Sequence, residues 1–192
     1  MTALPPLLSS GLLPKELDLA STTVTETEVE IIPLQSIERV RLLSGIYGPF
    51  KPPQPTRVPL WLAIYLRTKS KATILPPEWM SVASLQSHLQ QEQRNPGFSD
   101  LPLHWIGVSN ALLQSVASSD LEDSSQVRSL IKDLREIRQS KILAGIEMIN
   151  PVHLEMTNIG LHEVAELRPF FKTAFDDLKA FSRLRYESQE AQ

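Results

Sequence analysis

Cysteine is missing from this sequence of 192 residues. Disulfides, thiolate metal sites and cysteine nucleophiles are therefore excluded together. Histidine does not compensate, because none of the four histidines lies three or four residues from another, the spacing that places two ligands on one helix face. The acidic group Asp120, Glu122 and Asp123 is expected to stabilise the start of the following helix rather than to bind a divalent ion. The sequence therefore predicts no metal site.

Glycine is scarce, with seven residues, and none of them builds a recognisable catalytic or phosphate-binding loop. Gly45 and Gly48 lack both the spacing and the following Lys-Ser or Lys-Thr pair of a phosphate-binding loop. Gly107-Val108-Ser109 begins like the nucleophile elbow of a hydrolase, but Ala111 replaces the second glycine and the segment has helical spacing. We therefore expect no catalytic residue, no cofactor and no enzymatic activity.

Basic residues are fewer than acidic residues in this sequence. Lysine and arginine total 19 against 22 acidic residues, which gives a formal net charge of -3. A protein that holds DNA by its phosphates usually carries a basic face, so DNA contact is expected to be weak or indirect at most. The small cluster Arg67, Lys69 and Lys71 lies at a predicted helix end, where cations complement the helix dipole. Contact with nucleic acid or with an acidic partner is the alternative.

Long hydrophobic runs are absent as well. The longest, Val58–Leu66, is far shorter than the ~20 residues that a bilayer-spanning helix needs. The apolar N-terminus, Met1–Leu13, has no basic residue before Lys15, is interrupted by Pro5-Pro6 and is followed by no cleavage pattern. We therefore expect neither a membrane segment nor a signal peptide, and a soluble intracellular protein.

The sequence does contain enough hydrophobic residues, 42%, for a packed core. Residues 1–26 show little periodic apolar pattern and are expected to be poorly ordered. β-Branched runs at 29–32 and 37–42 predict two strands joined as a hairpin or meander. Two strands alone are only marginally stable in water, so this unit must dock on another element. Proline and glycine dominate residues 44–56, which we interpret as a turn-rich linker without regular structure and as a domain boundary.

Helical spacing begins at Pro59 and dominates the rest of the chain. We expect a helix to about Lys71, an extended piece at 72–75, and helices at about 81–94, 102–118, 124–149 and 161–185, the last broken or kinked at Pro169. The predicted fold class is α+β, with a small N-terminal β-rich domain followed by a larger helical domain. The divisions are a poorly ordered segment at 1–26, the β-rich domain and linker at 27–57, the helical domain at 58–186 and a tail at 187–192.

The apolar stripes of these helices supply the candidate core or partner-interface residues. The last helix has the most regular stripe, with a period near 3.5 residues that is typical of a helix–helix seam, and we expect it to carry the tightest packing. Glu136 is expected to pair with Lys132, one helical turn away. The candidates for core or interface are Trp61, Leu62, Ile64, Trp79, Leu134, Arg135, Ile137, Arg138, Leu167, Phe170, Phe171, Leu178 and Phe181.

Four segments, in this order, resemble the GINS family of eukaryotic DNA replication proteins, and in particular its subunit 2. They are Val58–Ile64 (VPLWLAI), Leu75–Met80 (LPPEWM), Asp133–Arg138 (DLREIR) and Glu166–Phe170 (ELRPF). The resemblance extends from about Glu28 to Tyr186, which is nearly the whole chain. None of the four segments is catalytic, so the resemblance and the missing catalytic motifs agree.

The resemblance implies a heterotetramer of four related subunits, each with a small β-rich and a larger helical domain. It also implies that the complex joins the MCM ring motor and a further helicase partner in the nucleus. The motor would hydrolyse ATP, and this subunit would be a non-catalytic scaffold bound to three other GINS subunits. A generic helical interaction adaptor without a replication role is the alternative. A hydrolase, a metal enzyme and a nucleic-acid-binding module are disfavoured by the missing motifs and the acidic charge.

Overall fold

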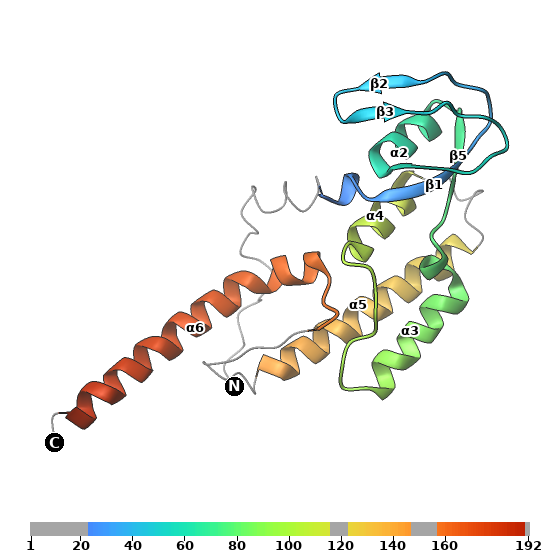
Figure 1. Ribbon diagram of the computed structural model, residues 1–192. Helices are drawn as coiled ribbons and strands as arrows, with labels where there is room; N and C mark the ends of the chain where they lie inside the picture. The colour runs from blue at the N-terminus through green and yellow to red at the C-terminus, as the bar shows by residue number, and fades with distance from the viewer. Residues whose placement is uncertain (1–22, 116–122, 147–156, 191–192) are drawn as a thin grey trace.

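The chain folds as a small sheet followed by helices. The computed structural model describes residues 23–115, 123–146 and 157–190. Most of the segment predicted to be poorly ordered, 1–26, lies outside these residues, and its last part, 23–25, is helical and leads into the first strand. The sheet, a hairpin and one helix lie at one end of the molecule, and the last helix extends away from the other helices (Figure 1). The predicted α+β class is confirmed.

The sheet has three antiparallel strands in the order β4-β1-β5. β1 (Glu28–Pro33) lies between β4 (Thr56–Pro59) and β5 (Ala72–Leu75). Along β1, Val29 and Ile31 are buried and Glu28 and Glu30 are exposed. This alternation follows from the two-residue period of a strand, which turns successive side chains to opposite faces. The apolar side of β1 therefore faces the core.

The predicted pairing of the first two apolar runs is wrong. β1 pairs with β4 and β5, whereas the second run forms β2 (Val40–Leu42) and pairs with β3 (Gly45–Tyr47). β3 lies in residues 44–56, so the expectation that this stretch holds no regular structure is also wrong. A strand buried on one face pairs where its apolar side is best covered. β4 and β5 flank the helix α2 (Leu60–Thr68), so the three strands and this helix form one unit around the apolar side of β1.

The β2–β3 hairpin is fastened to the sheet region by aromatic side chains. Phe50 is 1% exposed and pairs with Ile37 through two backbone hydrogen bonds of 2.9 and 3.0 Å. Tyr47 meets Trp61 of α2 edge to face, with ring centroids 6.2 Å apart. Gly48 has a φ of 94°, which side chains with a Cβ rarely adopt, and it allows the turn between Tyr47 and Phe50. The β2–β3 hairpin therefore docks on α2 and the adjoining chain.

α2 (Leu60–Thr68) begins directly after β4 and returns the chain to β5. β4 spans the predicted division between residues 57 and 58, and α2 and β5 pack with the N-terminal sheet. The chain leaves the sheet only at Pro76-Pro77, which precede a short 3-10 helix, η1 (Glu78–Met80). Proline has no N–H to donate to a ladder, so the strand ends there.

Four helical elements lie where the sequence predicts them. They are α3 (Val82–Arg94), α4 (Trp105–Ser115), α5 (Ser124–Ile146) and α6 (Leu161–Glu190). The ends predicted at 118 and 149 lie outside the described residues, and the tail predicted from 187 is wrong as far as Glu190, because the last helix continues to that residue. Ser81 caps α3, because its hydroxyl oxygen accepts the N–H of Ser84 at 3.3 Å. Pro169 does not break α6, which continues through it (Figure 1). Pro169 removes one backbone donor from the helix and crowds the carbonyl group four residues before it, without ending the helix.

One apolar core runs from the sheet through α2 and α4 into α3 and α5. Trp105 at the start of α4 is its largest fully buried side chain. Its members include Ile31 of the sheet, Leu60 of α2, Leu85 of α3 and Leu134 of α5, all 0% exposed. Because sheet and helices share this core, the N-terminal unit is held in place against the helices.

Candidate functional site

The nucleophile-elbow candidate is part of a buried helix. Ser109 lies inside α4, and its hydroxyl oxygen is 2.7 Å from the carbonyl oxygen of Trp105 and 3.0 Å from that of Ile106. Gly107 is explained by packing, since a Cβ there would lie 3.0 Å or less from both methyl carbons of Val24. This segment packs α4 against the chain that precedes β1 and presents no nucleophile to solvent.

A closed cluster of charged side chains joins three helices. Arg138 of α5 is 0% exposed. Its Nε and Nη2 donate to the two carboxylate oxygens of Glu163, at the start of α6, at 2.7 and 2.9 Å. Its Nη1 donates to Oε1 of Glu92, on α3, at 2.7 Å. A buried charge is very costly unless it is paired and hydrogen-bonded, and here one cation has two carboxylate partners.

Both carboxylates are satisfied by further donors. Glu92 Oε1 accepts the backbone N–H and the hydroxyl of Ser99, each at 2.8 Å, and its Oε2 accepts the ammonium of Lys141. Glu163 Oε2 accepts the backbone N–H of Gly160 at 2.7 Å. The cluster thereby fixes the connections that follow α3 and precede α6.

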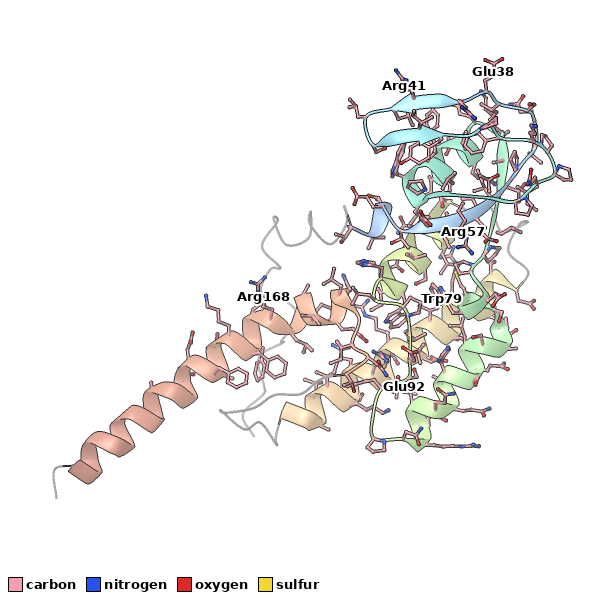
Figure 2. The ribbon with its side chains drawn as sticks, viewed as in Figure 1. Glu38, Arg41, Arg57, Trp79, Glu92 and Arg168 are labelled. Atoms are coloured by element: carbon pink, nitrogen blue, oxygen red, sulfur yellow. The ribbon has the colours of Figure 1, made fainter. Side chains whose placement is uncertain are left out.

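Aromatic rings and a backbone carbonyl complete the cluster. The guanidinium carbon of Arg138 lies 4.8 Å from the Phe98 ring centroid and 5.8 Å from that of Trp105. Its Nη2 also donates to the carbonyl oxygen of Asn158 at 2.7 Å. Glu92 lies among the helices, away from the hairpin end of the molecule (Figure 2). With every N–H of its guanidinium donated, Arg138 fastens the start of α6 to α3 and α5.

The electrostatics keep this cluster charged. Burial acts to raise the pKa of Glu92, but the hydrogen bonds from Lys141, Ser99 and Arg138 outweigh it and hold that pKa below the ordinary value of 4.5. Burial likewise acts to lower the pKa of Arg138, but the hydrogen bonds and charges of Glu163 and Glu92 raise it above its ordinary value. At neutral pH Glu92 and Arg138 are therefore both charged.

Acid is expected to weaken the fold through Glu92. A carboxylate whose pKa is lower in the folded than in the unfolded chain stabilises the fold fully above the unfolded pKa, about 4.3. That contribution is lost as the pH falls through the folded pKa. We expect the free energy of unfolding, measured by urea titration, to decline as the pH falls below about 5, and Glu92→Gln to flatten this decline.

Glu136→Gln is the matched control for this pH experiment. Glu136 pairs with Lys132 at 3.6 Å, as the sequence predicts, but its side chain is 64% exposed and solvent screens the pair. Glu136→Gln should therefore leave the pH dependence of the free energy of unfolding the same as in the natural chain. If Glu92→Gln and Glu136→Gln give the same slope, the buried carboxylate does not contribute to acid sensitivity.

α6 carries an apolar stripe that the described residues of this chain leave largely uncovered. Val164 is 45% exposed, and Leu167 is only partly buried. Phe171 meets Phe170 at 5.7 Å and Phe175 at 6.3 Å between ring centroids, and all three rings belong to the same helix. Among the described residues, no apolar side chain of α6 belongs to the buried core. The stripe is therefore an apolar surface on the described part of the chain.

The expectation that the last helix carries the tightest packing, in a core or at a partner interface, stays a prediction, and within this chain the described side chains of α6 do not supply that packing. Tight packing is found in α4 and α5, where Trp105 and Leu134 are completely buried. The side chains of Leu178 and Phe181, which the sequence placed on the same stripe, lie outside the described residues. A regular stripe reveals that a helix face is apolar, but it does not reveal whether the same chain covers that face.

The other predicted site residues divide between core and surface. Arg135 is half-buried and forms an ion pair with Glu166 across the α5–α6 junction. A second apolar surface, which the sequence did not single out, is the hairpin tip, where Leu43 is fully exposed and Ile46 is 60% exposed. The buried predicted residues are Leu62, Leu134 and Arg138, and the partly buried ones are Trp61, Ile64, Trp79 and Ile137.

Sequence reasoning missed Glu92 and Glu163, the two buried partners of Arg138. A local pattern could have found Glu92, because it follows Leu85 and Leu89 at helical spacing and so lies on the apolar face of α3. A carboxylate on an apolar face predicts a buried cationic partner. Nothing near Glu163 in the sequence marks it in the same way.

In the described part of the chain, no three side chains of the metal-ligating types come together as a site. Among these same residues, no helix combines the length and the apolar character that crossing a bilayer requires.

Comparison with known proteins matches both parts of the chain. Residues 17–75 match the model of the PSF2 N-terminal domain, and residues 79–181 match that of the GINS complex protein helical bundle domain. A Schizosaccharomyces pombe protein named DNA replication complex GINS protein psf2 is 36% identical over 182 residues, covering 91% of this chain and 98% of its own length. The corresponding PSF2 proteins of Xenopus laevis and Saccharomyces cerevisiae are 32% and 37% identical, over 79% and 65% of this chain and 83% and 59% of their own lengths.

Proposed function

This chain belongs to the PSF2 family of DNA replication GINS proteins, and we propose that it is a non-catalytic scaffold subunit of a GINS heterotetramer. In this proposal it binds three other GINS subunits in the nucleus. The assembled complex joins the MCM ring motor and its further helicase partner for initiation and elongation of DNA replication. The motor hydrolyses ATP, and this chain supplies only binding surfaces.

The observation that carries this proposal is the uncovered stripe of α6. An exposed apolar face on a long helix costs solubility unless another protein covers it. The Arg138 cluster supports the same function, because it holds the start of α6 rigidly while the rest of the helix extends from the body of the chain (Figure 1). A fixed helix with an apolar stripe is suited to packing against helices of other subunits.

Co-expression tests this proposal directly. We expect the tagged full-length chain to be poorly soluble alone, and to purify as an equimolar four-subunit assembly when the three other GINS subunits of the same organism are co-expressed. Size exclusion with light scattering measures the mass of the assembly, and pull-down with the MCM ring tests the second step. The assembly without the motor should hydrolyse no ATP.

A monomeric chain would contradict the proposal. The decisive result would be a chain that melts cooperatively alone, exposes no apolar surface to a hydrophobic dye and retains none of the three subunits. A chain that instead retained unrelated proteins, but not the GINS subunits, would favour the generic interaction adaptor.

A further inference from the structure

A groove of about 560 Å³ lies at the junction between the sheet and the helices. Its walls come from the start of β1, from β4, and from the segment that leaves β5 and enters η1. Arg57 and Trp79 mark this junction in Figure 2, on the side of the molecule away from Arg168 and the extended helix α6. The groove is therefore separate from the surface proposed to hold the other subunits.

Part of the groove lining is apolar. Trp79 is half-buried there, and Pro76-Pro77 form the adjoining wall. On this side of β1 the ladder ends at the pair Glu30–Leu75, because the prolines that follow have no N–H to donate. A flat indole beside prolines offers a face for the aliphatic stems and the cationic heads of long side chains.

The rim of the groove is acidic. Glu28, Glu30 and Glu78 supply three carboxylates against the single guanidinium of Arg57, which leaves an excess of two negative charges. Arg57 is paired with Glu30 at 3.0 Å. Among the described residues, Glu28 and Glu78 have no cationic partner, and no lysine or arginine lies over the Trp79 ring. The groove thus repels phosphate and attracts cations.

We propose that this groove docks an extended segment of another protein that carries lysine or arginine. The basic side chains pair with Glu28 and Glu78, and one of them lies on the Trp79 ring. Because the groove lies apart from α6, it stays open when other subunits cover the stripe of that helix. This gives the chain a second binding surface, with a chemistry opposite to that of the apolar stripe.

The test uses a defined peptide and the full chain in the assembly with which it purifies. The probe is a fluorescein-labelled, amidated ten-residue peptide in which lysine and arginine alternate with serine, followed by fluorescence polarisation. Glu28→Gln combined with Glu78→Gln should weaken binding about tenfold, the combined effect of losing two solvent-screened ion pairs. Rising salt should weaken binding of the natural chain more than that of this double variant.

Glu38→Gln is the matched control, because Glu38 is an exposed carboxylate beside the hairpin, far from the groove (Figure 2). The Glu38→Gln variant should bind the peptide with the same affinity as the natural chain. A photoreactive version of the probe should cross-link to residues 75–80, as read by mass spectrometry. Equal affinity for the natural chain and the double variant, or cross-links only elsewhere, would overturn the proposal.

The double variant should also assemble with the other subunits in full yield. A loss of assembly confined to the double variant would overturn the proposal, since the groove would then lie within a subunit interface. The comparison is between variants of this one chain, so its result does not depend on which subunits co-purify. If the groove proposal is wrong, the natural chain and the double variant bind the peptide equally. If the GINS proposal is wrong, the natural chain does not co-purify with the other GINS subunits.

Discussion

Replacing Arg138 by alanine will release the start of α6 from the body of the chain. The change leaves Glu92 and Glu163 buried without their shared cation, and breaking a buried ion pair costs about 3–5 kcal/mol. Since the total free energy of unfolding of an ordinary domain is only about 5–15 kcal/mol, this loss removes a large part of it. Hydrogen exchange of the peptides of this chain, measured by mass spectrometry in the purified assembly, should rise roughly a hundredfold or more around residues 95–101 and 157–166.

Arg135→Ala is the control for this change. Arg135 lies one helical turn before Arg138 and pairs with Glu166, but its side chain is 41% exposed, so its loss should cost no more than about 1 kcal/mol. Neutralising Glu92 and Glu163 to glutamine in the Arg138→Ala chain should recover part of the protection, because no carboxylate then remains buried without a cation. Equal exchange in the two alanine variants would mean that the cluster does not hold α6.

Replacing Phe171 by alanine will reduce assembly rather than the stability of this chain. Phe171 touches rings of its own helix and lies outside the buried core, so its loss opens no cavity in the described part of the chain. If the stripe packs against another subunit, removing an aromatic anchor at the centre of such a contact costs about 2–4 kcal/mol of binding. The yield of co-expressed complex on size exclusion should fall by roughly tenfold or more.

Asp176→Ala is the matched change on another part of α6, where the side chain is exposed. It should leave the yield of complex unchanged. The two aromatic neighbours of Phe171 make a further comparison possible, since alanine at Phe175 should act in the same direction. Full yield from both phenylalanine variants would mean that the stripe faces solvent in the complex, and the proposed subunit contact would be wrong.

Local spacing was sufficient to predict the helices. An apolar residue every three to four positions marks α3, α5 and α6 in the sequence, and Pro59 marks the start of α2. Pairing of strands was not predictable in this way. β1 finds its partners Thr56–Pro59 and Ala72–Leu75 far along the chain, and a preference for a partner at that distance leaves no pattern in the residues of β1 themselves.

The sequence alone determined the family of this protein, its α+β class and the identity of its apolar faces, because these depend on residue types at fixed local spacing. Only the tertiary structure decided what covers each face. It buried Arg138 with Glu92, 46 positions before it, and Glu163, 25 positions after it, and it left the stripe of α6 without a cover from the described residues. The physical reason is that burial and charge pairing are set by which distant segments meet, and a helix face carries the same pattern whether its partner lies in the same chain or in another.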